Sequence, residues 1–133
     1  MSITLKSTKD LPIPLLDELF DSVNWLPRKQ KWDRILQISR YICTAWHDDK
    51  LIGMGRILED GEMAVIYDFC VRPEHRRKGI GTQILDHLLN QIKDKGYYSI
   101  SLFPWEHDPK LIPFYEKFGF KQIPGMELKK DHN

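Results

Sequence analysis

The stretch that decides the fold reads Asp68-Phe69-Cys70-Val71-Arg72-Pro73-Glu74-His75-Arg76-Arg77-Lys78-Gly79-Ile80-Gly81-Thr82. It joins the end of an apolar, strand-like run to a segment in which apolar residues recur with a helical period. A helix N-terminus presents unpaired backbone N–H groups and a partial positive charge. Glycines let a phosphate approach that backbone closely, and the basic side chains add formal charge. The stretch therefore predicts a diphosphate-binding turn between a strand and a helix.

Two well-known phosphate-binding motifs do not fit this turn. A P-loop needs glycines five residues apart and a lysine after the second one, whereas Thr82 follows Gly81 here. A dinucleotide-binding fingerprint needs a third glycine or alanine where Ile84 stands, within a wholly parallel sheet. Neither motif therefore accounts for this turn.

Short elements with clear punctuation surround this turn. We expect strands over residues 2–6, 41–46, 51–58, 63–71, 97–103 and 120–128, and helices over residues 12–26, around 32–36, 79–96 and 111–118. Asp60-Gly61 predicts a hairpin before the fourth strand, which makes the first half of the sheet antiparallel. The helix from Gly79 must return the chain to a parallel strand. The sequence thus predicts an α/β fold with a mixed sheet.

Length and composition limit the function classes. A chain of 133 residues fits a single domain, residues 1–133, and 41% hydrophobic with 29% charged residues is typical of a globular core. The formal net charge of +1 argues against a nucleic-acid partner. No apolar run reaches the ~18 residues that span a membrane, so we expect no membrane partner. The N-terminal residues do not resemble a signal peptide, and we expect a cytoplasmic protein.

The two cysteines, Cys43 and Cys70, both lie in strand-like apolar runs. Buried free thiols are favoured over a disulfide in a chain without a secretion signal. The histidines and cysteines show no metal-ligand spacing, so we expect no metal site.

Two linked motifs carry a resemblance to a known family. Val71-x-Pro73 leads into Arg76-x-x-Gly79-x-Gly81, and Phe114-Tyr115-Glu116-Lys117-Phe118-Gly119-Phe120 follows downstream. Over residues 51–120 the chain resembles the GNAT superfamily of acetyl-CoA-dependent N-acetyltransferases. The resemblance implies a mixed, mostly antiparallel sheet with a central, splayed pair of parallel strands and helices on both faces.

The resemblance also implies roles for individual residues. The pantetheine arm of acetyl-CoA would lie between the splayed strands, and a backbone N–H near Cys70 or Val71 would polarise the thioester carbonyl. Tyr115 would protonate the departing thiolate, and Asp68 is a candidate general base. The implied cofactor-binding residues are Phe69, Cys70, Val71, Arg76, Arg77, Lys78, Gly79, Ile80, Gly81, Thr82, Asp108, Phe114 and Lys117.

Several of these residues also have a structural interpretation. Tyr115 lies on an apolar helical stripe, where most aromatic residues are core packing. Asp68 could instead satisfy local backbone donors, and a strand cysteine such as Cys70 is usually inert. Three tryptophans divide evenly between core packing and the lining of an acceptor pocket: Trp25, Trp32 and Trp46.

The sequence departs from the family pattern at two positions. Tyr67 stands where many members carry a carboxylate that acts as base, so amine deprotonation has no single obvious carboxylate. Asp108 stands where asparagine is common, and Asp108-Pro109 suits a helix N-cap with proline at the first position. Pro113 then falls early in that helix and would shift or kink its start.

The resemblance implies direct attack of a primary amine on acetyl-CoA in a ternary complex, with a small molecule as the acceptor. The two N-terminal helices and the strand over residues 51–58 would build the acceptor pocket, with four candidate polar groups: Asp21, Arg56, Glu59 and Glu62. The alternatives are acetylation of a protein lysine or N-terminus and a non-catalytic CoA-binding module. The sequence is compatible with a homodimer.

Overall fold

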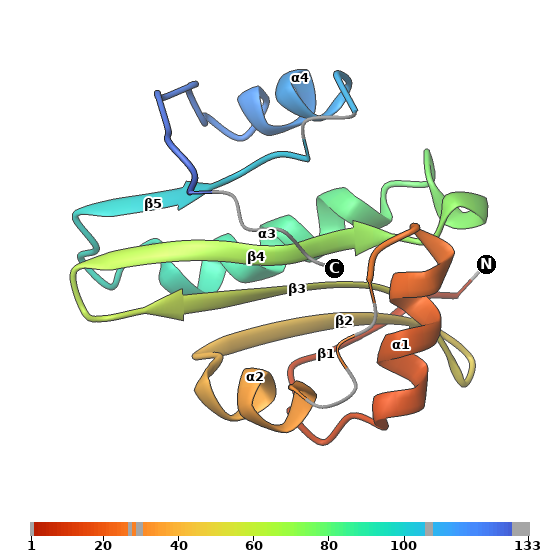
Figure 1. Cartoon of the computed structure of the whole chain (residues 1–133). Coiled ribbons are helices and arrows are strands. Elements are labelled where there is room, and N and C mark those ends of the chain that lie inside the picture. The colour runs from red at the N-terminus through yellow and green to blue at the C-terminus, as the bar shows by residue number, and fades with distance from the viewer. Residues whose placement is uncertain (1, 27, 29–30, 106–107, 129–133) are drawn as a thin grey trace. The chain divides into compact units, whose positions relative to one another are not determined.

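Five strands form one mixed sheet in the order β1-β2-β3-β4-β5 (Figure 1). Their bounds are Thr4–Lys6, Tyr41–His47, Lys50–Glu59, Met63–Val71 and Ser99–Leu102. Neighbouring strands pair antiparallel from β1 to β4, whereas β4 and β5 are parallel. This arrangement confirms the predicted α/β class, with its antiparallel first half and its parallel pair joined by a helix.

The computed structural model describes residues 2–26, 28, 31–105 and 108–128. These residues belong to two compact units, Met1–Leu102 and Phe103–Asn133. The first unit holds the sheet with helices α1, Ile13–Ser22, α2, Trp32–Ile38, and α3, Ile80–Ile92. The second unit holds α4, Leu111–Glu116. The helix over residues 12–26 therefore ends at Ser22, four residues earlier than expected.

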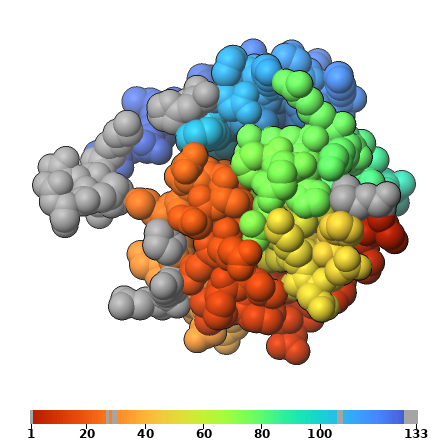
Figure 2. All heavy atoms as spheres, turned by 90° about the vertical axis from the view of Figure 1, so that its right-hand side faces the viewer, coloured from red at the N-terminus to blue at the C-terminus, as the bar shows by residue number. Residues whose placement is uncertain are grey.

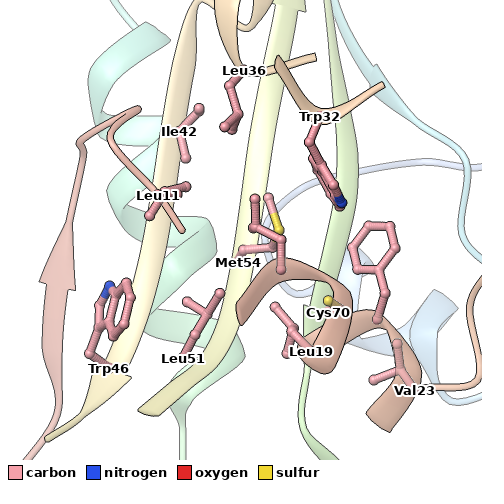
Figure 3. Packing of buried hydrophobic residues seen from close by; sticks show 12 residues of the cluster. Leu11, Leu19, Val23, Trp32, Leu36, Ile42, Trp46, Leu51, Met54 and Cys70 are labelled. Carbon is pink, nitrogen blue, oxygen red and sulfur yellow. The ribbon is translucent and has the colours of Figure 1, made fainter. Parts of the chain in front are cut away.

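Alternate residues of β3 show that helices cover both faces of the sheet. Met54 packs into the core cluster that includes α1 and α2 (Figure 3). A Cβ atom on Gly53 would lie 2.9 Å from Cδ1 of Ile84, and one on Gly55 would lie 2.8 Å from Cδ1 of Leu88. Since successive strand residues point to opposite faces, α3 lies on the face opposite α1. The two glycines allow α3 to pack closely against β3.

The tryptophans of the first unit are core residues. Trp32 and Trp46 are buried, and their indole N–H groups donate to Asp17 Oδ1 at 2.9 Å and to Thr44 Oγ1 at 2.8 Å. Trp25 is partly buried and packs edge-on against Phe20, with ring centroids 5.0 Å apart. Of the two interpretations left open by the sequence, the structure thus supports core packing.

The end of the chain differs from the prediction. Residues 120–128 form no strand, so β5 is the last strand of the described sheet, and the parallel pair lies at its end instead of its centre. Pro124-Gly125 explains the difference, because proline cannot donate to a strand ladder and glycine weakens a strand. The apolar side chains of Ile123, Met126 and Leu128 are exposed.

Helix α4 begins at Leu111, the start expected from the apolar spacing, and two residues later than an N-cap at Asp108 would place it. Its N-cap is Lys110, and Asp108 instead accepts a hydrogen bond from the Lys110 backbone N–H at 3.0 Å in the preceding turn. Pro113 becomes the third helical residue, where its missing N–H would have no intrahelical partner. The expectation that Pro113 shifts the helix start is therefore confirmed, and the expected N-cap at Asp108 is wrong.

Within the described residues, no helix is long and apolar enough to cross a membrane. The same part of the chain contains no group of three or more His, Cys, Asp or Glu side chains arranged to hold a metal ion.

Candidate active site

The turn between β4 and α3 combines a short 3-10 helix with a glycine N-cap. The 3-10 helix covers Pro73–His75, where the sequence predicted only a turn. Gly79 caps α3 with φ 79°, a left-handed backbone conformation that favours glycine. Arg77 also has a positive φ, 62°. The backbone therefore makes a sharp, glycine-dependent turn directly before α3.

The start of α3 offers its backbone N–H groups to an external acceptor. No side chain caps the helix, and no acidic residue lies in its first turn. The first helical N–H to bond within the chain belongs to Gln83, which donates to the carbonyl of Gly79 at 3.0 Å. A phosphate could accept from the N–H groups that precede it, as the motif predicts.

Basic side chains surround this helix start. Arg76, Arg77 and Lys78 are exposed, as is Thr82 in the first turn. Arg76 donates from Nε to the carbonyl of Val71 at 3.1 Å, so it lies against the end of β4. Figure 2 shows the green atoms of this region on the surface, beside the yellow atoms of the turn between β2 and β3. The turn thus presents backbone N–H groups and positive charge to an anion.

Strand β4 continues beyond its pairing with β5. The last paired residues are Ile66 and Leu102, although β4 runs on to Val71 (Figure 1). The sequence-predicted residues Phe69, Cys70 and Val71 all lie in this extension. Residues 67–71 of β4 therefore lie beyond its last pair with β5.

A bulge distorts β4 within this extension. Cys70 pairs with Met54 and Tyr67 with Arg56, so two β4 residues face the single residue Gly55. Asp68 has φ 54°, and aspartate is among the few non-glycine residues that adopt such values readily. The bulge directs the Asp68 side chain to the face that carries the N-terminal helices.

Asp68 holds two guanidinium groups at the bulge. Its Oδ2 accepts from Arg28 Nη1 at 2.8 Å and from Arg56 Nε at 2.7 Å, and only 6% of its side chain is exposed. Arg56 also donates to Ser39 Oγ at 3.3 Å and lies over the ring of Tyr67. Asp68 thus satisfies side-chain donors, whereas the sequence suggested either a general base or an acceptor of local backbone donors.

The polar groups expected to line the acetyl-acceptor pocket do not all lie beside the bulge. Glu59 accepts from the Gly61 backbone N–H, and Glu62 is exposed in the same hairpin. This hairpin lies three pairs along the ladder from Arg56, and Asp21 is exposed on α1. Only Arg56, of the four candidates, lies beside the bulge.

Cys70 is a buried, protonated thiol. Its burial raises its pKa well above the ordinary value, with a smaller contribution from the negative charge of Asp68. Cys43 on β2 is also buried and free, and its pKa is raised to about 12 by burial. Because the thiolate is the reactive form, neither cysteine suits a nucleophile at neutral pH.

We therefore expect Cys70→Ala to retain turnover within a few-fold of the unaltered protein. The matched control is Cys43→Ala, which removes a buried thiol from another strand. Steady-state rates of thiol release from acetyl-CoA measure both variants. Detection of an acetylated Cys70 peptide by mass spectrometry during turnover would contradict this expectation.

Arg72, at the start of the basic turn, is a buried structural residue. Its side chain is buried, donates from Nε to the carbonyl of Leu51 at 2.8 Å, and pairs through Nη2 with Glu18 at 2.9 Å. Arg72, the first residue after β4, therefore holds the start of the turn against α1 and β3. Its place before Pro73 gives no sequence signal of this burial.

The second unit carries the remaining predicted residues. Tyr115 is buried on α4, with its ring centroid 5.2 Å from that of Phe114 and 5.9 Å from that of Phe120. Lys117 is exposed and follows the helix as its C-cap, and Asp108 precedes it. The aromatic rings of the closing motif thus pack against one another within the second unit.

Comparisons with known proteins agree on one family. The model of the Acetyltransferase (GNAT) family matches residues 8–120. The uncharacterized N-acetyltransferase ycf52 of Pyropia yezoensis is 31% identical over 128 residues, which cover 92% of this chain and 72% of that protein. Serotonin N-acetyltransferase 2, chloroplastic, of Oryza sativa subsp. japonica is 26% identical over 127 residues, covering 90% of this chain and 61% of that protein.

A solved structure shows the same fold. The GNAT-family acetyltransferase SP0256 of Streptococcus pneumoniae TIGR4 superposes with a TM-score of 0.84 at 25% identity, covering 97% of this chain and 98% of that one.

Proposed function

Since this chain belongs to the GNAT family of acetyltransferases, we propose that it moves the acetyl group of acetyl-CoA onto the primary amine of a small molecule. The observation that carries the proposal is the start of α3. Its N-cap is Gly79, no side chain bonds its first N–H groups, and the basic turn before it is exposed. Direct attack in a ternary complex is favoured, because the strand cysteine nearest the site is buried and protonated.

The residues present suit each part of acetyl-CoA. The first-turn N–H groups of α3 and the side chains of Arg76, Arg77 and Lys78 suit the diphosphate. The β4 extension, residues 67–71, suits the pantetheine arm. The thioester supplies an activated acyl group, and a backbone N–H at Cys70 or Val71 would stabilise the oxyanion that forms during attack.

Two protons must move during the reaction. The amine must lose a proton before it attacks, and Tyr67 offers no carboxylate for this step. The ion pairs of Asp68 favour a role in holding Arg28 and Arg56 over one as sole general base, so the amine proton leaves through water. Tyr115 of the closing motif protonates the departing thiolate. The family match spans both compact units, which supports one acetyltransferase domain over residues 1–133.

A small-molecule acceptor is favoured by the one relative above whose name states a substrate, serotonin. The same relative is named as chloroplastic. The cytoplasmic location of the present chain stays a prediction from its sequence.

We expect Gly79→Leu to weaken CoA binding at least 10-fold, equivalent to about 1.4 kcal/mol. A side chain at φ 79° forces the turn out of its conformation and disturbs the N–H groups that would hold the diphosphate. Isothermal calorimetry with CoA measures the effect.

The matched control is Gly61→Leu in the hairpin between β3 and β4. Gly61 has φ 94°, and a Cβ atom at Gly61 or at Gly79 meets nothing within 4 Å. Both variants should therefore lose similar folding stability, about 1–2 kcal/mol. Equal CoA affinity in the two variants would remove the diphosphate role from this turn.

A further inference from the structure

Two arginines share one carboxylate beside the β4 extension. Arg28, from the connection between α1 and α2, and Arg56 of β3 both donate to the same oxygen of Asp68. Among the described residues, Asp68 is the only acidic partner of either arginine in an ion pair. The two guanidinium groups and the one carboxylate therefore leave the cluster with one net positive charge.

The excess charge resides on Arg28. The side chain of Arg56 is 7% exposed and has Asp68, Ser39 and the Tyr67 ring as partners. That of Arg28 is 36% exposed, and its guanidinium lies 5.1 Å from the centroid of the Phe20 ring. Since only Nη1 of Arg28 contacts Asp68, its other guanidinium nitrogens can donate to a ligand.

The exposed Lys31 adds to the positive charge of this connection. The segment from Val23 to Trp32 contains no acidic residue, and Asp21 and Asp33 lie just outside it. A polycationic acceptor would meet like charges at this point, whereas an anion would be attracted.

The cluster lies close to the proposed site of acetyl transfer. Asp68 precedes Cys70 by two residues, and a strand advances about 3.3 Å per residue. Arg28 contacts Asp68 directly, so its guanidinium lies within about 10 Å of the β4 backbone that would polarise the thioester. A small amine whose acidic group lies a few bonds from its nitrogen could reach both points.

We propose that the acceptor amine carries an anionic group, a carboxylate or a phosphate, and that the guanidinium of Arg28 binds this group. The proposal rests on the acetyl transfer proposed above. A guanidinium presents paired N–H donors that match the oxygens of either group.

Matched pairs of acceptors test the proposal. One pair is glycine and glycinamide, and the other is phosphoethanolamine and ethanolamine, so that the two arms separate carboxylate from phosphate. Thiol release from acetyl-CoA gives kcat/KM for each acceptor with the unaltered protein, Arg28→Gln and Arg28→Lys. We expect the anionic member of at least one pair to be favoured, and Arg28→Gln to lower its kcat/KM by about 10- to 100-fold, chiefly through KM.

The control variant is Arg40→Gln. Arg40 is similarly placed over a ring, that of Tyr41, and is ion-paired with Glu59 in a different part of the sheet. It should leave the preference unchanged, and Arg28→Lys should retain part of it. Raising the ionic strength should raise KM for the acceptor that carries the acidic group and not for the partner that lacks it.

Two results would overturn the inference while acetyl transfer stands. The first is that, in both pairs, the amine without an acidic group is acetylated as well as its partner. The second is that Arg28→Gln leaves the preference intact. Absence of thiol release with every acceptor, in a protein that binds CoA, would instead contradict the proposed function and the inference with it.

Discussion

Replacing Tyr115 with phenylalanine is expected to lower the turnover number by about 10²- to 10⁴-fold, the contribution typical of one positioned general acid. The variant removes only the hydroxyl group. The ring contacts with Phe114 and Phe120 remain, so the free energy of unfolding should change by no more than about 1 kcal/mol, the value of one hydrogen bond. CoA affinity should be unchanged, because the proposed diphosphate site uses the α3 turn.

The control for this variant is Tyr98→Phe, which removes the hydroxyl of an exposed tyrosine before β5. Glu62→Gln tests the alternative that a carboxylate is the essential group, and it should reduce turnover less than Tyr115→Phe. Normal turnover in Tyr115→Phe together with an inactive Glu62→Gln variant would show that the acid–base assignment is wrong.

Asp68→Asn is expected to lower the free energy of unfolding by about 3 kcal/mol or more, as for other buried ion pairs that lose one partner. Asparagine tolerates the positive φ at the bulge, so the backbone is not the source of the loss. The loss comes from the buried guanidinium of Arg56, which keeps only Ser39 and the Tyr67 ring as partners. Chemical denaturation monitored by tryptophan fluorescence measures the change.

Asp48→Asn is a close control for this effect. Asp48 has the same φ of 54°, but its side chain is 92% exposed. Its replacement should change the free energy of unfolding by less than about 0.5 kcal/mol. If Asp68→Asn is equally mild, Asp68 does not hold the bulge through its ion pairs, and its assignment as the general base gains weight.

The sequence predicted the framework of the site well where local chemistry dictates structure. Gly79 is the N-cap of α3 because glycine readily supplies the φ of 79° before the apolar helical stripe. Asp60-Gly61 predicted the β3–β4 hairpin, in which Asp60 Oδ1 accepts from the N–H groups of Glu62 and Met63. In both places the residues that specify the turn lie within it.

Features that depend on distant partners were not predictable in the same way. Arg28 and Asp68 are 40 residues apart, and nothing near Arg28 in the sequence indicates that it contacts β4. The bulge at Asp68 had one usable signal, a single charged residue inside the apolar run from Met63 to Val71. Aspartate is enriched at positive φ, so a lone one within a buried strand suggests a bulge.

The ends of elements in the second unit show a related limit of local patterns. Pro113 correctly indicated an altered helix start, because a proline is tolerated only in the first helical turn. The sequence from Phe120 to Leu128 suggested a strand, but a strand requires a partner for its backbone groups. Residues 120–128 have no strand pairing in the described part of the chain.

The most direct test of the central claim follows the acetyl group itself. The full chain is incubated with acetyl-CoA carrying an isotopic label in the acetyl group and with the paired carboxylate, phosphate and neutral amines. We predict that the label appears as an N-acetyl amide on a small amine, with one free CoA thiol formed for each amide. A label that remains on CoA with every amine, or that accumulates on the protein, would contradict the account.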